Sequence, residues 1–282
     1  MADFSLEDLK TLRERLGTGM VETKNALVEA GGSLEKATEL LRLKGAKGNA
    51  KRADRSTSEG LVAAKENGST TTLIELDCET DFVAKSEKFV TLGEKILAAV
   101  VAAGATSSEE GLAASVPSTG SGQAAQTVAE LIGDEAAILG EKIELRRVAV
   151  VSGDRFAVYL HKTSKDLPPQ VGVVVGYSGD DAETARSIAQ HISFADPQYL
   201  SRDEVPAEDV ETERRIVEEI SRNEGKPEAA LPKIIEGRIN GFFKQVVLSE
   251  QDYARDNKLS VAKVLKDAGL TVNGFARFKV GA

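Results

Sequence analysis

The side chains that could act as nucleophiles or metal ligands are few in this chain. The 282 residues include one cysteine, Cys78, and two histidines, His161 and His191. A catalytic triad needs a histidine beside a nucleophile, and a structural zinc site needs four cysteine or histidine ligands. His191 lies within a predicted helix as a packing or surface residue, and Cys78 lies within a predicted strand as a small core residue. These residues predict neither an active site nor a metal site.

Phosphate-binding motifs are also missing from the sequence. No segment fits the P-loop pattern, and Gly-Thr-Gly at 17–19 has neither the third glycine nor the preceding strand of a dinucleotide fingerprint.

His161 stands at the end of a predicted strand, where it could meet a partner or a loop carbonyl, and its residue type favours the second. We therefore expect no cofactor, no direct nucleotide binding and no enzymatic activity.

One segment, Thr80-Asp81-Phe82-Val83, combines residue types in an unusual way. Two large apolar residues stand beside a charge, where a predicted strand gives way to a helix. Phe82 could fold back onto the core, which the residue types alone favour, or it could protrude. A protruding aromatic ring is an effective anchor in a protein interface. Both positions for Phe82 stay open on this argument.

Periodicity predicts the elements that must position this segment. Two strands around Asn67-Gly68, a hairpin signal, are followed by a helix within residues 60–103. The same order, strands and then a helix, recurs at 142–195. A helix and a strand follow near the end of the chain. This pattern predicts an α+β fold with two related halves and antiparallel sheets.

Helical regions are predicted on both sides of this core. A Ser5 cap and leucines at helical spacing begin a unit of three helices that ends before Gly45. Residues 46–59 are basic and hold almost no large apolar group, which indicates a linker or an exposed end of a helix. Two amphipathic stretches joined by a short turn predict an antiparallel helical hairpin.

These elements divide the chain into five predicted parts. They are a three-helix domain at 1–45, a basic linker at 46–59, one core subdomain at 60–140, a second at 141–200 and 248–282, and a helical hairpin inserted at 201–247. Within the first subdomain, residues 104–123 are rich in glycine and serine and are predicted as a loop.

Charge and hydropathy narrow the classes of partner. The chain has 36 basic and 45 acidic residues, a net charge of −9, and because residues 1–55 carry +2 the remainder carries −11. An acidic body disfavours broad nucleic-acid binding, since phosphate neutralisation needs a basic surface. The longest apolar run falls far short of the ~18 residues of a membrane span. An acidic, amphipathic N-terminus and a single cysteine favour a cytoplasmic protein without a secretory signal or membrane attachment.

Four segments of the chain resemble the bacterial elongation factor Ts family. They are LRERLGTGMVETKNAL at 12–27, CETDFVAKSEKF at 78–89, ILGEKIELRRV at 138–148 and VNGFARFKVG at 272–281. The segments occur in the family's order and spacing, and the first two are highly specific. The resemblance implies a ubiquitin-associated-like (UBA-like) three-helix N-terminal domain, a core of two α+β subdomains and an inserted helical hairpin.

The resemblance also implies a function, guanine nucleotide exchange on elongation factor Tu during translation elongation. Such a protein binds the GDP form of Tu, loosens the nucleotide and its magnesium, and leaves when GTP enters. Thr80, Asp81, Phe82 and Val83 match the segment that enters the GTPase domain of Tu near the magnesium site. Further contacts with Tu are implied for Met20 and Lys24, for Leu139 and Gly140, and for His161.

A second class of function is open for the N-terminal region, that of an adaptor that binds nucleic acid or protein. Its helical domain and basic linker would supply positive charge from Lys44, Lys47, Lys51, Arg52 and Arg55. The charge of −11 on the rest of the chain disfavours RNA as the partner. Strong, salt-dependent RNA binding would distinguish an adaptor from an exchange factor.

Overall fold

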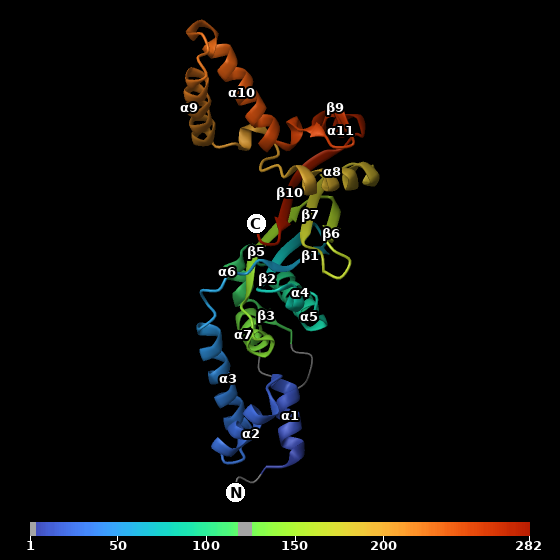
Figure 1. Ribbon diagram of the computed structural model, residues 1–282. Helices are drawn as coiled ribbons and strands as arrows, with labels where there is room; N and C mark the ends of the chain where they lie inside the picture. Colours follow the sequence, from blue (N-terminus) through green and yellow to red (C-terminus); the bar gives the residue numbers. More distant parts are fainter. Residues whose placement is uncertain (1–3, 118–125) are drawn as a thin grey trace.

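The computed structural model describes residues 4–117 and 126–282. The described chain is elongated, with a helical bundle at one end, two small sheets in the middle and a pair of helices projecting at the other end (Figure 1). Both central sheets are antiparallel, and helices cover their outer faces. The predicted α+β class is confirmed.

Three N-terminal helices form the bundle: α1 (Leu6–Leu16), α2 (Met20–Glu29) and α3 (Leu34–Ala50). The start of α1 follows from local hydrogen bonding, because the Ser5 hydroxyl accepts from the Asp8 N–H and the Asp8 carboxylate accepts from the Ser5 N–H. A small apolar core joins the three helices and consists of Leu9, Leu12, Ala26, Leu27, Ala37 and Leu41.

Helix α3 does not end at Gly45, as the sequence predicted, but continues to Ala50. Gly45 is a packing residue rather than a terminator. A Cβ atom on it would lie 2.9 Å from the Cβ of Ala137 in α7 (Val128–Leu139), so its small size lets the two helices approach closely. The first part of the predicted linker at 46–59 is therefore helical and docked.

The first sheet has the order β1-β2-β5, with strands Glu59–Asn67, Thr70–Cys78 and Ile143–Ser152. Its hairpin turn contains Gly68 at φ +64°, as the Asn67-Gly68 signal predicted. One face packs against α4 (Asp81–Ala84), α5 (Glu87–Ala103) and α7, around a core that includes fully buried Phe89 and Ile96.

Part of the segment predicted as a loop at 104–123 is ordered secondary structure. Helix α6 spans Ser108–Ala113, and strand β3 (Ser115–Val116) pairs with β4 (Gln126–Thr127). Gly111 lets α6 lie close to the sheet, because a Cβ there would meet Leu145 at 2.9 Å. Residues 118–123 of the predicted loop lie outside the described residues.

The second sheet has the order β10-β7-β6, with strands Thr271–Lys279, Val171–Ser178 and Arg155–His161. Helices α8 (Ala182–Ala195) and α11 (Val261–Asp267) pack on it. A short ribbon that the sequence did not predict, β8 (Asp252–Tyr253) with β9 (Asp256–Ser260), precedes α11. Short 3₁₀ turns occupy Arg202–Glu204, Glu228–Ala230 and Leu248–Glu250.

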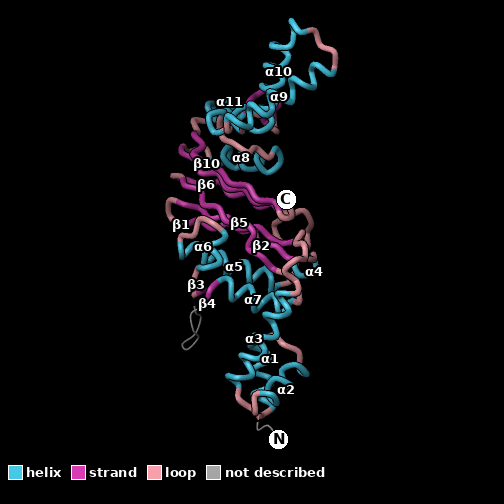
Figure 2. Tube along the Cα trace, turned by 90° about the vertical axis from the view of Figure 1, so that its left-hand side faces the viewer, coloured by secondary structure: helices cyan, strands magenta, loops and turns pink. Residues whose placement is uncertain are grey.

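The two sheets lie face to face (Figure 2). They share an apolar cluster that consists of Val62, Leu73, Val151, Val174, Phe278 and Val280. Close approach depends on Gly172, since a Cβ there would lie 2.4 Å from a Val62 methyl carbon. The tight contact makes the two halves of the core one packed unit.

The projecting hairpin consists of α9 (Ala207–Asn223) and α10 (Leu231–Val246), as predicted, and has its own apolar cluster. Although α9 is amphipathic, its residue Ile220 is 43% exposed. Ser221 is buried in its place and donates a hydrogen bond to the Val217 carbonyl at 2.6 Å. Among the described residues, no helix has both the length and the apolar character needed to cross a membrane.

Candidate protein-binding site

The segment from Glu79 to Lys85, here called the Phe82 turn, connects β2 to α5. Thr80 is the N-cap of α4, and its hydroxyl accepts a hydrogen bond from the Val83 N–H at 3.4 Å. Val83 and Ala84 are buried in the core of the first sheet. Phe82 is 73% exposed, so the folded-back position that its residue type favoured is wrong. The two residues that follow it take the core positions, and α4 directs the ring outward.

Charged neighbours surround the exposed ring of Phe82. The Lys85 ammonium lies 4.3 Å from the ring centroid and also pairs with the Asp81 carboxylate at 3.1 Å. A cation over an aromatic face is favourable by about 0.5–1 kcal/mol at exposed sites. The ring, the carboxylate and the ammonium therefore form one small exposed cluster on α4.

Two glutamates, Glu79 and Glu141, join the Phe82 turn to the turn that follows α7, and we call this pair the carboxylate clamp. The Glu141 carboxylate accepts hydrogen bonds from the Glu79 N–H at 3.1 Å, the Thr80 N–H at 3.0 Å and the Thr80 hydroxyl at 2.6 Å. In return, the Glu79 carboxylate accepts from the Lys142 N–H at 2.6 Å and pairs with Arg55 at 3.2 Å. Sequence reasoning missed both glutamates, because single acids in turns carry no periodic signal.

The clamp places Leu139 and Gly140 beside the Phe82 turn. Leu139 is the last residue of α7 and is half-buried, and Gly140 follows at φ +77°. This left-handed conformation is easy for glycine, and it turns the chain so that Glu141 faces Thr80. The structure therefore brings together two groups of residues that the sequence singled out separately.

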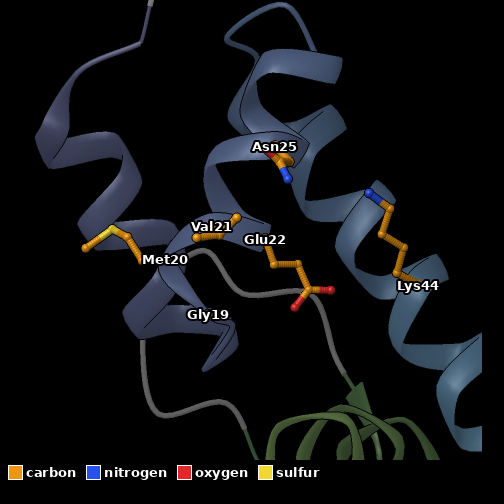
Figure 3. A pocket seen from close by; sticks show the side chains of 6 residues that line it. All are labelled: Gly19, Met20, Val21, Glu22, Asn25 and Lys44. Atoms are coloured by element: carbon orange, nitrogen blue, oxygen red, sulfur yellow. The ribbon is translucent and has the colours of Figure 1, made fainter.

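Met20 and Lys24 lie on α2, in the N-terminal bundle. Both are exposed, and Met20 and its neighbour Val21 leave 47% and 72% of their surfaces open. Met20 and Val21 line a shallow hollow together with Gly19, Glu22, Asn25 and Lys44 (Figure 3). Lys24 does not belong to that lining. The hollow therefore combines two exposed apolar side chains of α2 with charged and polar neighbours.

The N-terminal bundle contacts the base of the same site. A Cβ on Gly17, in the turn between α1 and α2, would lie 2.6 Å from a side-chain carbon of Ile138, the residue before Leu139. Gly17 has φ +61°, so its conformation and its surroundings both require glycine. Through Gly17 and Gly45, the bundle meets α7 at two points.

His161 lies at the end of β6, in the second sheet, and its side chain is exposed. Its ring shares a hydrogen bond between Nδ1 and the Tyr159 hydroxyl at 3.1 Å and stacks on the Tyr159 ring. The side chain meets another side chain rather than the loop carbonyl that the sequence favoured. The exposed His161 and the half-buried Tyr159 thus form a paired polar and aromatic group on the second half of the core.

The other two candidate chemical groups have packing roles. His191 is buried in α8, where it hydrogen bonds Gln251 through Nε2 at 2.9 Å and accepts from the Ala254 N–H at 3.1 Å, and burial lowers its pKa. Cys78 is fully buried, and burial raises the pKa of its thiol. Within residues 4–117 and 126–282, no group of three or more metal-ligating side chains is found.

Comparison with known proteins agrees with the four sequence segments. The elongation factor Ts family model matches residues 79–282. Elongation factor Ts of Leifsonia xyli subsp. xyli is 75% identical over 283 residues, and that of Clavibacter sepedonicus is 69% identical over 282 residues. Elongation factor Ts of Tropheryma whipplei is 53% identical over 281 residues, and all three alignments cover 100% of both chains. The chain belongs to the elongation factor Ts family.

Proposed function

We propose that this protein is a guanine nucleotide exchange factor for elongation factor Tu. The observation that carries the proposal is the exposed ring of Phe82. Helix α4 directs this ring outward, and hydrogen bonds from Thr80 to Glu141 hold the turn in which it lies. Large aromatic rings held rigidly at a surface are frequent energetic centres of protein interfaces. Membership of the elongation factor Ts family names Tu as the partner.

In the proposed mechanism, Thr80, Asp81, Phe82 and Val83 approach Tu near its magnesium and nucleotide site. Phe82 and Asp81 present the ring and the charge, whereas Thr80 and Val83 orient them from inside the turn. The protein binds Tu with GDP, weakens the hold of Tu on GDP and magnesium, and leaves when GTP binds. It makes and breaks no covalent bond, so it acts as an exchange factor and not as an enzyme.

Thermodynamic linkage sets what such a mechanism requires. The factor by which this protein weakens GDP binding to Tu equals the factor by which GDP weakens binding of this protein. Nucleotide-free Tu must therefore be the form that it binds most tightly. Met20, Lys24, Leu139, Gly140 and His161 are proposed as further contacts that hold Tu while the nucleotide departs.

Release of a fluorescent GDP analogue from Tu tests this function directly. Addition of the protein should accelerate release, and a complex with nucleotide-free Tu should dissociate when GDP is added. A release rate that is unchanged at any concentration of the protein would contradict the proposal.

RNA binding that weakens steeply with salt would instead favour the adaptor. Several basic groups of that alternative are already engaged within the molecule, as Arg55 pairs with Glu79 and Lys44 with Glu29.

Replacement of Gly45, at the contact between the N-terminal bundle and α7, should weaken binding to Tu. Gly45→Leu would force α3 away from Ala137, and the Asn49 amide would lose its 2.8 Å hydrogen bond to the Gly133 carbonyl. The exposed side chains of Met20 and Val21 on α2, here called the Met20 surface, would then be misplaced relative to the Phe82 turn. Affinity for nucleotide-free Tu should therefore fall about tenfold, or about 1.4 kcal/mol. Titration of Tu with the variant measures this.

Gly48→Leu on the same helix is the matched control for this prediction. It gives the same gain in helix propensity, about 1 kcal/mol relative to glycine. A Cβ at position 48 meets only the flexible end of the Arg52 side chain, at 3.4 Å. This variant should bind Tu normally. If Gly45→Leu binds as tightly as Gly48→Leu, then docking of the bundle does not position the Met20 surface.

A further inference from the structure

We propose that Glu141 is a positioning residue for nucleotide exchange, because its carboxylate sets the direction in which α4 presents Phe82. This inference rests on the proposed function and adds to it a residue that does not itself need to touch Tu. Glu141 comes 59 residues after Phe82 in the chain and reaches the Phe82 turn only through the fold. Three steps in the geometry support its role.

The first step concerns backbone groups that secondary structure leaves without partners. Strand β2 ends at Cys78 and α4 begins at Asp81, so the N–H groups of Glu79 and Thr80 lie between two elements. Both donate to Oε2 of Glu141, at 3.1 and 3.0 Å. Hydrogen bonds to an ionised acceptor are roughly twice as strong as neutral ones. The carboxylate therefore fixes the backbone from which α4 starts.

The second step concerns the Thr80 hydroxyl, which carries a single proton. It donates this proton to Oε1 of Glu141 at 2.6 Å, so its lone pairs remain available to accept from the Val83 N–H. The same hydroxyl is the N-cap of α4, a helix of only four residues that has little stability of its own. Glu141 thereby orients the cap, and the cap orients the helix that carries Phe82.

The third step concerns the return contact through Glu79. The Glu79 carboxylate accepts from the Lys142 N–H at 2.6 Å, so each turn supplies one carboxylate to the backbone of the other. Leu139 and Gly140 directly precede Glu141 and are held by the same clamp. Tu would thus meet the ring and the adjoining loop in one preformed arrangement, which avoids the cost of ordering them on binding.

Glu141→Gln is the first test, because it keeps the size of the side chain but replaces one acceptor oxygen with a donor amide. At saturating concentrations of the variant, the rate of GDP release from Tu should fall about tenfold or more, because α4 would no longer hold the Phe82 ring in the direction in which it meets Tu. The concentration for half-maximal effect should change less than about threefold, since the other contacts carry association. Glu144→Gln is the control, as Glu144 bonds Thr57 and Lys142 and not the Phe82 turn.

A double-mutant cycle separates positioning from general stabilisation. If Glu141 acts through the ring, adding Glu141→Gln to Phe82→Ala should lower the rate further by less than about twofold. A full tenfold additional loss in that background would overturn the proposal, as would a folded Glu141→Gln variant with the wild-type maximal rate. Thr80→Val removes the hydroxyl that both donates to Glu141 and caps α4, and it should reproduce the loss, which keeps the test decisive if Glu141→Gln fails to fold.

Amide hydrogen exchange on the isolated protein tests the geometry without Tu. Glu141→Gln should increase the rate of amide hydrogen exchange in the peptide that spans residues 79–85 by at least about tenfold relative to Glu144→Gln. Unchanged protection there would contradict the role of Glu141 even if exchange activity were lost. Conversely, a wild-type protein that fails to release GDP from Tu would contradict the proposed function while leaving this measurement of the clamp intact.

Discussion

Phe82→Ala should weaken binding to nucleotide-free Tu by about thirtyfold or more, which corresponds to about 2 kcal/mol. The free energy of unfolding should remain nearly unchanged, because the ring is 73% exposed in the free protein and its loss removes little buried apolar surface. GDP release from Tu should slow in parallel. Fluorescence-monitored GDP release, a Tu titration and thermal unfolding of the same preparation measure the three effects.

Two other phenylalanines provide controls for the Phe82 experiment. Phe194, at the end of α8, is 84% exposed, so Phe194→Ala matches the chemistry of the change away from the Phe82 turn and should leave exchange intact. Phe89 is fully buried on α5, and Phe89→Ala should cost about 3–5 kcal/mol of stability. A large fall in melting temperature of Phe82→Ala, with normal exchange for each folded molecule, would contradict the interface role.

The second large effect concerns Asp77, which is buried on the face of β2 that meets the second sheet. Neither of its carboxylate oxygens has a hydrogen-bond partner among the described residues, and the nearest cation, Arg146, lies 3.7 Å away. Glu75, two residues earlier on the same face, is buried as well and pairs with Arg147. A register shift in the pairing of β2 with β5 allows both consecutive arginines to reach the two acids.

Burial, with the nearby charges of Glu75 and Glu144, raises the pKa of Asp77 from about 3.8 to about 7, against the opposing effect of Arg146 and Arg147. Between these two pH values, the folded protein binds a proton at Asp77 that the unfolded chain has lost. The free energy of unfolding therefore falls as pH rises through this window. A pKa shift of this size lowers the free energy of unfolding above pH 7 by at most about 4 kcal/mol, relative to the acidic end of the window.

Asp77→Asn should therefore stabilise the protein at pH 8 by on the order of 2 kcal/mol and remove this pH dependence. His191 acts in the opposite sense, because burial lowers its pKa: below its ordinary value of about 6.5, the unfolded chain binds a proton more readily. Its contribution to stability is thus lost as pH falls. The wild-type profile combines both slopes, and Asp77→Asn should leave the rising one.

Urea unfolding at pH 5, 6.5 and 8 tests this prediction, with Asp180→Asn as a surface control. The Asp180 side chain is 92% exposed in its pair with Arg155, so its loss should change stability by less than about 1 kcal/mol. An Asp77→Asn protein that is less stable than wild type at pH 8 would show that Arg146 keeps Asp77 ionised and stabilising.

Local structure in this protein could be predicted where the deciding hydrogen bonds are local. The Ser5–Asp8 capping box and the hairpin at Gly68 each depend on residues within a few positions of one another. Apolar periodicity similarly identified the helices and strands of both sheets. The four family segments pointed to the elongation factor Ts family because their residue types, order and spacing are specific in the sequence alone.

The tertiary structure decided which side of an element faces outward and what holds it there. Phe82, Val83 and Ala84 are three apolar residues in a row, and the core of the first sheet buries Val83 and Ala84 while Phe82 stays exposed. Gly45 resembles a helix end in sequence but serves as a contact for Ala137. Asp77 looks like an ordinary strand acid until the second sheet covers it. In each case the deciding partner lies far along the chain, and sequence periodicity carries information only about near neighbours.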